Sequence, residues 1–233
     1  MRVLLGGADG VADPAALTDD DLAVLYAPPD GPFVRANMVA TVDGAATGPD
    51  GRSGGINDEA DHRVFATLRR LCDAVVVGAG TARDEGYGVS AVPIVLVSRR
   101  GQVPEGLRGH DPGRVLLATC ASAAGLAEAR AQLGDDHVLV LGEDAVDLAA
   151  LPAALGERGL HALLSEGGPG LLGDLLAAGV VDELCATVVP RLLGGGHPRI
   201  VGGDGVDVPL EPVLLLEEGG TLLGRWRVRR HDV

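Results

Sequence analysis

The chain has 233 residues and a formal net charge of −14, and although 46% of its residues are hydrophobic, only 2% are aromatic. An acidic surface of this kind repels nucleic acid and anionic membranes, so both are excluded as partners. A core with so few aromatic side chains must be built from Val, Leu, Ala and Ile, which is typical of a buried parallel or mixed sheet. Any anionic ligand would need a local site of positive charge.

The cysteines and the apolar segments exclude several other classes of protein. Cys72, Cys120 and Cys185 form no CxxC pair and have no spacing typical of a metal site or a disulfide framework. No secretory leader pattern is present, and no apolar run reaches about 18 residues. We therefore expect a soluble cytoplasmic protein without a structural metal.

The chain begins with a segment rich in Gly, Asp and Pro, which we expect to pack on the domain as an extension over residues 1–32. From residue 33 to residue 233 we expect one domain, in which strands and helices alternate. The pattern predicts strands at 33–42, 74–77, 93–98, 114–119, 137–141 and 161–165, and helices at 58–71, 123–133, 146–158 and 169–178.

The last part of the chain changes character. Strands are predicted at 183–189, 213–218 and 221–229 with no helices between them, and Glu218-Gly219-Gly220 reads as a hairpin turn. The chain therefore predicts a three-layer α/β fold, in which antiparallel C-terminal strands close one edge of a mostly parallel sheet.

A glycine-rich segment after the strand at 161–165 is the sharpest motif. It reads SEGGPGLLG over residues 165–173, with Gly168, Gly170 and Gly173 at GxGxxG spacing and Pro169 in the first turn of a helix. Glycines let a phosphate approach the backbone, and a helix N-terminus offers unpaired N–H groups. The same glycines could instead only tighten the turn, and the acidic residue expected about 20 positions later in a Rossmann domain has no clear counterpart.

Three further strand ends carry candidate residues. Gly78-Ala79-Gly80-Thr81 forms a second glycine turn, and two such turns indicate a shared crevice. Ser98-Arg99-Arg100 could pair with a 2′-phosphate, since arginine suits phosphate oxygens. Asp43-Gly44 ends the strand at 33–42 with a carboxylate. Taken alone, the last two are more commonly a solvated surface and a simple turn.

Together, TVDG at 41–44, VGAGT at 77–81, SEGGPGLLGDLLAAGVVDE at 165–183 and PRLLGGG at 190–196 resemble the RibD C-terminal (pyrimidine reductase) family. The resemblance covers about residues 33–230. It implies a dihydrofolate-reductase-like fold, NADPH as hydride donor, and a homodimer. It also implies reduction of 5-amino-6-(5-phosphoribosylamino)uracil, a step of riboflavin synthesis. The H-x-E and P-C-x-x-C motifs of the fused zinc deaminase domain are missing, so we expect a stand-alone reductase.

The resemblance also assigns residues. Ala40, Gly55, Thr81 and Glu85 match cofactor-contacting positions, as does the loop at 168–174, and Ser53, Arg69 and Glu166 match substrate-side positions. With the motifs above, the expected cofactor contacts are Ala40, Gly55, Gly78, Gly80, Thr81, Glu85, Ser98, Arg99, Gly167, Gly168, Pro169, Gly170, Leu171 and Leu172.

The main departure from the family lies at residues 86–91, GYGVSA, where members that bind the phosphoribosyl substrate usually carry an arginine. A substrate phosphate would have to use Arg52, Arg69 or Arg83 instead. A pterin or another small heterocycle is therefore an open alternative substrate, and a module that binds NADPH without turnover is a third possibility.

Glu166 and Asp43 are the expected catalytic residues, because both follow strands that end at the expected crevice. We expect Glu166 to orient substrate hydroxyl or ring N–H groups, and Asp43 to organise its turn or relay a proton. The six histidines pair with no nucleophile motif and are expected to be structural or surface residues rather than catalytic ones.

Overall fold

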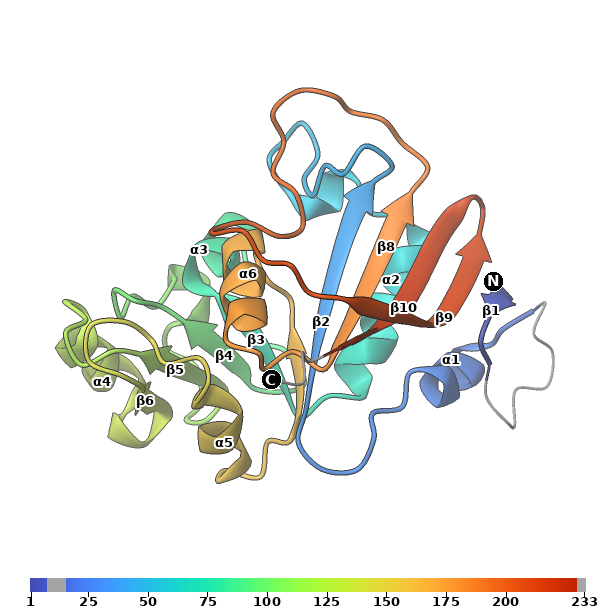
Figure 1. Cartoon of the computed structure of the whole chain (residues 1–233). Coiled ribbons are helices and arrows are strands. Elements are labelled where there is room, and N and C mark those ends of the chain that lie inside the picture. The colour runs from blue at the N-terminus through green and yellow to red at the C-terminus, as the bar shows by residue number, and fades with distance from the viewer. Residues whose placement is uncertain (8–15, 230–233) are drawn as a thin grey trace.

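The computed structural model describes residues 1–7 and 16–229, and one ten-stranded sheet runs through them (Figure 1). The strand order is β1-β9-β10-β8-β2-β7-β3-β4-β5-β6. The strands are β1 (Arg2–Leu5), β2 (Phe33–Thr41), β3 (Ala74–Gly78), β4 (Ile94–Val97), β5 (Val115–Thr119), β6 (Val138–Val140), β7 (Ala162–Ser165), β8 (Glu183–Val189), β9 (Leu210–Glu218) and β10 (Thr221–Val228). The α-helices are α1 (Asp19–Leu25), α2 (Glu59–Arg70), α3 (Ala79–Asp84), α4 (Leu126–Leu133), α5 (Leu151–Gly156) and α6 (Pro169–Ala177).

The sheet is parallel from β8 to β6 and antiparallel at its other end. β2 pairs with β7 and β8 in parallel, and β3, β4, β5 and β6 continue the parallel part. β10 pairs antiparallel with both β8 and β9, and β1 pairs antiparallel with β9. The predicted mostly parallel sheet with antiparallel C-terminal strands is confirmed.

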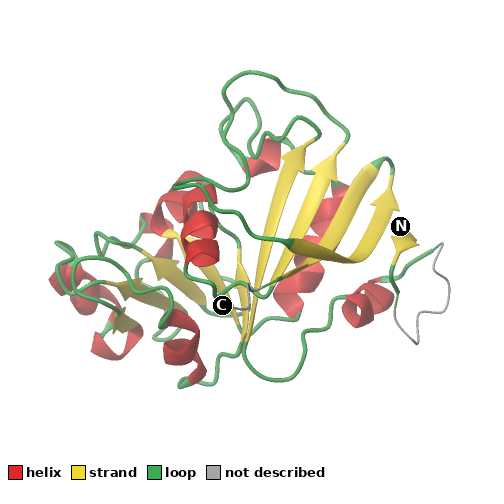
Figure 2. Cartoon of the chain, viewed as in Figure 1, coloured by secondary structure: helices red, strands yellow, loops and turns green. Residues whose placement is uncertain are grey.

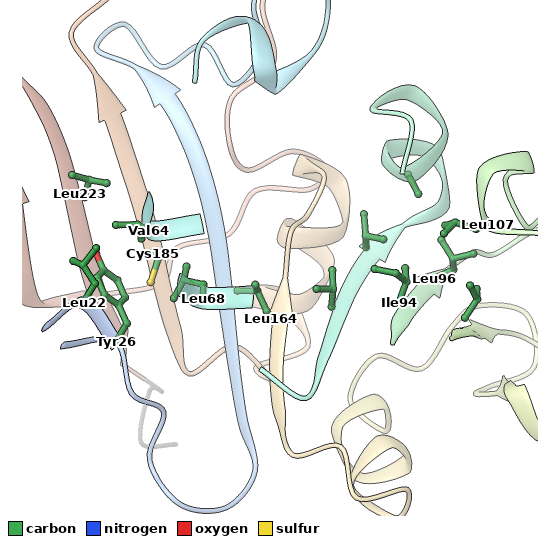
Figure 3. Packing of buried hydrophobic residues seen from close by; sticks show 14 of the residues in the cluster. Leu22, Tyr26, Val64, Leu68, Ile94, Leu96, Leu107, Leu164, Cys185 and Leu223 are labelled. Carbon is green, nitrogen blue, oxygen red and sulfur yellow. The ribbon is translucent and has the colours of Figure 1, made fainter. Parts of the chain in front are cut away.

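Helices cover both faces of the sheet, which gives three layers (Figure 2). Alternate residues of β3 divide between two apolar cores: Val75 and Val77 join the first, and Ala74 and Val76 join the second. α1, α2, α3 and α4 contribute to the first core, part of which is shown in Figure 3, and α5 and α6 contribute to the second. The predicted three-layer α/β architecture is confirmed.

Several elements differ from those predicted; α4, for example, begins at Leu126 rather than at 123. β1 was not expected, because a four-residue run whose partner strand lies more than 200 positions away carries no local signal. α5 begins at Leu151 rather than at 146, because the Asp147 carboxylate accepts hydrogen bonds from the N–H groups of Ala149 and Ala150 and holds a turn there. β9 begins at Leu210, three residues early, and includes Pro212.

The first 32 residues contribute β1 and α1 to the described structure. Thr18 caps α1 in a reciprocal arrangement with Asp21, and Leu22 and Leu25 enter the first core. None of the helices in the described part of the chain is long and apolar enough to cross a membrane.

The sheet divides between β2 and β7. β2 pairs with β7 only from Phe33 to Ala36, whereas β8 accompanies it as far as Thr41. Beyond Ser165 the chain bends toward β3, where the Glu166 N–H donates to the Val76 carbonyl and the Gly167 carbonyl accepts from the Gly78 N–H. A gap in the strand pairing therefore opens beside the second half of β2. The loops that follow β2 and β8 rise together above these strand ends (Figure 1).

Candidate active site

A cavity of about 480 Å³ lies where β2 and β7 separate. We call it the Glu166 cavity. Asn37 and Met38 both line it, and because consecutive strand residues point to opposite faces, the cavity reaches both sides of the sheet. α2, α3, the loop between β2 and α2, and the segment that follows β7 supply the other walls.

A charged and aromatic cluster forms one wall of the Glu166 cavity. The Arg69 guanidinium donates two hydrogen bonds of 2.7 Å to the two carboxylate oxygens of Glu166, and the Tyr87 hydroxyl donates a third of 2.5 Å. Arg69 also lies 4.5 Å from the centre of the Phe65 ring and 5.6 Å from that of Tyr87. α2 supplies Arg69 and Phe65, Glu166 follows β7, and Tyr87 follows α3. Three distant segments of the chain thus converge on one carboxylate.

The cluster fixes the charge of its members. Burial lowers the pKa of Arg69, but the hydrogen bond and charge of Glu166 outweigh it and raise the pKa overall. Burial, together with the negative charge of Glu166, raises the pKa of Tyr87 well above its ordinary value. Arg69 is therefore cationic and Tyr87 is a neutral donor. Glu166, which is 8% exposed, accepts hydrogen bonds from both.

Two hydrogen bonds tie α3 to its neighbours around the cavity. The Ser53 N–H donates to a carboxylate oxygen of Glu85 at 2.8 Å, and the Gly168 N–H donates to the Thr81 hydroxyl at 2.9 Å. Ser53, Thr81, Glu85 and Gly168 all line the Glu166 cavity. α3, with Glu85 directly after it, therefore holds in place the loop between β2 and α2, which carries Ser53, and the glycine-rich segment at 165–173.

Of the three glycines at GxGxxG spacing in the glycine-rich segment 165–173, one is open and two are closely packed. A Cβ at Gly170 would meet no atom within 4 Å, whereas a Cβ at Gly168 would overlap the Thr81 hydroxyl and one at Gly173 would overlap the Gly202 carbonyl. Gly168 caps α6 without a side-chain hydrogen bond, and Pro169 opens the helix. Leu171 and Leu172 enter the second core, so only their backbones can face a ligand. The N-terminus of α6 is thus a bare backbone surface that fits a phosphate group.

A second cavity, of about 670 Å³, lies on the other side of α3. We call it the arginine cavity. Gly80 and Arg83 of α3 line it, as do Ser98 and Arg99 after β4. Its charged lining residues are Arg83, Arg99, Arg100, Arg108, Glu105 and Glu128. In a chain of net charge −14, this is a local excess of positive charge.

Eight of the expected residues line neither cavity: Ala40, Asp43, Gly55, Gly78, Gly167, Gly170, Leu171 and Leu172. Ala40 is buried in β2, the Gly55 carbonyl accepts from Arg191, and the Gly78 N–H donates to the Gly167 carbonyl. Asp43 is exposed, and its carboxylate accepts hydrogen bonds from the Thr41 hydroxyl and from two backbone N–H groups of the loop after β8, at Leu193 and Gly194. The Thr41 hydroxyl, followed by these N–H groups, holds the pKa of Asp43 below its ordinary value.

Among the residues of the Glu166 cavity that were not expected from the sequence are Asn37, Asp61, Phe65 and Tyr87. None belongs to a motif. A signal was available for two of them, because the chain has only two phenylalanines and two tyrosines, and one of each lies here. Within residues 1–7 and 16–229, no group of three His, Cys, Asp or Glu side chains is placed to hold a metal ion.

A model of the RibD C-terminal domain matches residues 32–221. The chain belongs to the RibD C-terminal domain family. The expected resemblance and its dihydrofolate-reductase-like fold are therefore confirmed.

Relatives of this RibD C-terminal domain protein include two archaeal proteins named 2,5-diamino-6-ribosylamino-4(3H)-pyrimidinone 5′-phosphate reductase. The one from Methanothermobacter thermautotrophicus is 31% identical, over 83% of this chain and 94% of its own. The one from Archaeoglobus fulgidus is 30% identical, over 70% and 83%. Among solved structures, a pyrimidine reductase-like protein from Corynebacterium diphtheriae matches with a TM-score of 0.77 and 26% identity, over 92% of this chain and 100% of its own.

Proposed function

We propose that this protein is an NADPH-dependent reductase that acts on the ribose of a ribosylaminopyrimidine 5′-phosphate. This class contains the 5-amino-6-(5-phosphoribosylamino)uracil implied by the resemblance and the 2,5-diaminopyrimidinone named for the archaeal relatives. One observation carries the proposal. The Glu166 cavity and the arginine cavity lie on the two sides of α3, and the open N-terminus of α6 lies beside Thr81 and Gly168.

The chain offers a surface along which an extended dinucleotide would fit. The pyrophosphate would lie on the backbone of Gly170 and Gly80, where a Cβ meets either nothing or only the far end of Arg83. Ser98 and Arg99 would face the 2′-phosphate in the arginine cavity, which favours NADPH over NADH. The nicotinamide end would enter the Glu166 cavity past Thr81 and Pro169.

In the proposed reaction, C1′ of the open-chain imine accepts a hydride that bound NADPH supplies, the C=N electron pair moves to nitrogen, and that nitrogen takes a proton. Glu166 is not a proton donor, because Arg69 and Tyr87 both donate to its carboxylate. We assign Glu166 to accepting hydrogen bonds from substrate N–H or O–H groups, with Arg69 fixing its orientation. Asp43 is assigned to holding the two loops above the strand ends together.

The charge of the Glu166 cavity favours a second candidate. Among the described residues that line it are four carboxylates, those of Asp61, Asp84, Glu85 and Glu166, against the single arginine Arg69, which is already paired. In our proposal the substrate phosphate therefore lies at the cavity mouth, toward the exposed Arg52 and Arg83. An unphosphorylated pterin would avoid this repulsion altogether, so a dihydrofolate- or pterin-type reductase is the alternative.

A homodimer and a cytoplasmic location stay predictions. β9 and β10 are paired on both edges within the chain, so a second copy could not extend those two strands. Light scattering on the purified protein measures the mass of the assembly.

Oxidation of NADPH by the purified chain, with the ribosylaminopyrimidine phosphate and dihydrofolate offered separately, tests the proposed function. A protein that binds NADPH but oxidises it with neither compound would be a binding module rather than a reductase.

A further inference from the structure

Three residues that line the Glu166 cavity have a buried side-chain oxygen that accepts no hydrogen bond in the described part of the chain: Asn57, which is half-buried, and Asp61 and Asn37, which are the most deeply buried. Within the described part of the chain, Oδ1 of Asp61 and Oδ1 of Asn37 are buried and accept no hydrogen bond. The two residues are 2% and 8% exposed, and both line the cavity. Native proteins rarely bury such atoms unpaired, because each costs the free energy of its lost hydration.

The fold brings these two acceptors to the same side of the sheet. The Thr187 hydroxyl on β8 lies beside the Asp61 carboxylate and acts to lower its pKa, and Thr187 pairs in register with Val39 on β2. Asn37 is two residues before Val39 and therefore points to the same face of the strand. Asp61 on α2 thus lies above the part of β2 that carries Asn37.

The side of α2 that faces the cavity presents side chains that would suit a planar ring of a ligand. Asp61, Phe65 and Arg69 follow one another at intervals of four residues, so they share one face of the helix, and all three line the cavity. Phe65 offers an aromatic surface beside the Asp61 carboxylate. Arg69, in the last turn of α2, forms the ion pair with Glu166 at the C-terminal end of the same face.

The Asp61 carboxylate has few favourable contacts of its own. Burial, followed by the nearby charge of Asp58, raises the pKa of Asp61, against smaller lowering effects of Thr187 and His62. The other charged residues that line this cavity are Asp84, Glu85, Glu166 and Arg69. A ligand that brings N–H donors to Asp61 would relieve this cost.

We propose that Asp61 and Asn37 form the subsite that reads the substrate ring, and that they select a ring with an amino group next to a ring N–H over the corresponding dioxo ring. A 2-amino-4(3H)-pyrimidinone edge presents two neighbouring donors, which match two acceptors. A uracil edge presents one donor beside a carbonyl oxygen, which would face an acceptor. The inference rests on the proposed function and specifies its substrate: the 2,5-diamino compound rather than the uracil compound.

The test compares the two ring types on the full-length protein loaded with NADPH. The ratio of kcat/KM for the 2,5-diaminopyrimidinone to that for the aminouracil should favour the diamino compound by on the order of tenfold to a hundredfold, the usual effect of a hydrogen bond to a charged group. Isocytosine and uracil, as unreactive rings titrated in a calorimeter, should show the same preference. Their binding does not require turnover, so it tests the subsite even if neither ribosylamino compound is reduced.

Two variants, with one control variant, distinguish a change in the preference between the two rings from a change in affinity for both. Asp61→Asn carries one acceptor and two donors and complements the uracil edge, so it should invert the preference. Asn37→Ala should reduce the preference for the amino ring without inverting it. Asp84→Asn removes a carboxylate from another wall of the same cavity, where Asp84 on α3 pairs with Arg83, and should shift the affinity for both rings by a similar factor. Circular dichroism and Tm show whether each variant is folded.

Equal affinity of the wild type for isocytosine and uracil would overturn the proposal. So would an unchanged preference in both folded variants, Asp61→Asn and Asn37→Ala. If the ring preference and its inversion are found while neither ribosylamino compound is reduced, the subsite stands and the proposed function fails.

Discussion

Arg69 and Glu166 meet in a two-pronged ion pair, Nε to Oε1 and Nη2 to Oε2, both at 2.7 Å. The pair joins the last turn of α2 to the residue directly after β7, at the place where β7 leaves β2. Paired arginine and carboxylate groups of this geometry have a fixed relative orientation. The ion pair therefore sets the direction in which the Glu166 carboxylate faces the cavity.

Replacing Glu166 with Gln should lower kcat. An amide has one acceptor oxygen in place of two, loses the negative charge that holds Arg69, and turns an N–H group toward Tyr87 or Arg69. Loss of a charge-assisted hydrogen bond costs about 1.5–3 kcal/mol, so we expect a fall of tenfold or more. NADPH affinity, measured by fluorescence titration, should stay close to wild type. An unchanged kcat would remove Glu166 from the reaction.

Tyr87 is expected to act through Glu166. Tyr87→Phe keeps the ring beside Arg69 but removes the hydroxyl that donates to Glu166, so kcat should fall by less than in Glu166→Gln. Tyr87→Ala also removes the ring and should raise KM in addition. Steady-state kinetics with separate kcat and KM values distinguish the two variants. If Tyr87→Phe were as damaging as Glu166→Gln, the hydroxyl would have a role of its own.

Gly170 and Gly173 form a matched pair in the same helix. Gly170→Ala should keep or raise the unfolding free energy, by about 0.4–1 kcal/mol, because its Cβ meets no atom. It should weaken NADPH binding, because the new methyl group occupies the surface proposed for the pyrophosphate. The measurements are Tm and a fluorescence titration.

Gly173→Ala should lower the unfolding free energy, since its Cβ would overlap the Gly202 carbonyl. It should leave NADPH binding close to wild type. Overpacking of this kind costs about 1–3 kcal/mol, or some 2–12 °C in Tm for a chain of this size. Unaltered NADPH affinity in Gly170→Ala would contradict the placement of the pyrophosphate.

The choice of cofactor should depend on Arg99. This side chain is exposed, lines the arginine cavity, and is expected to contact the 2′-phosphate that distinguishes NADPH from NADH. Arg99→Ala should weaken NADPH by about tenfold and leave NADH nearly unaffected. Dissociation constants for both cofactors test this. Glu128→Ala, a carboxylate variant in the same cavity, is the control and should not weaken NADPH.

Asp61 should make stability depend on pH. Burial raises its pKa, so the folded state favours the neutral acid more than the unfolded state does. The folded state is therefore relatively more stable at low pH, and this extra stability is lost as pH rises through the folded-state pKa. Asp61→Asn removes the buried charge. The variant should therefore have a higher Tm than wild type at pH 8, with the difference shrinking toward pH 4. A difference of the same size at both pH values would contradict this explanation.

Much of the fold could be predicted because the signals are local. The aliphatic runs of β3, β4 and β5 and the glycine turn at the start of α6 lie close to where the sequence indicated them. α5 began later than expected because one carboxylate, that of Asp147, competes for the first backbone N–H groups. β1 has no such local signal, since it depends on pairing with β9.

The site was predictable only in part, for a related reason. Arg69 and Glu166 were expected to share the substrate side, but their direct pairing results from the way α2 crosses the sheet where β7 ends. Asp61 and Asn37 are ordinary residues of a helix and a strand, and only the separation of β2 from β7 makes them cavity residues. Asp43 follows β2, as expected, yet the loop after β8 captures its carboxylate.

The most direct measurement is the rate of NADPH oxidation, followed at the nicotinamide absorbance, when the purified chain receives the 2,5-diaminopyrimidinone, the aminouracil and dihydrofolate in separate reactions. We predict rapid oxidation with the ribosylaminopyrimidine phosphates, faster with the diamino compound, and a strong decrease in Glu166→Gln. Oxidation with dihydrofolate alone, or with none of the three, would contradict the proposed reductase activity.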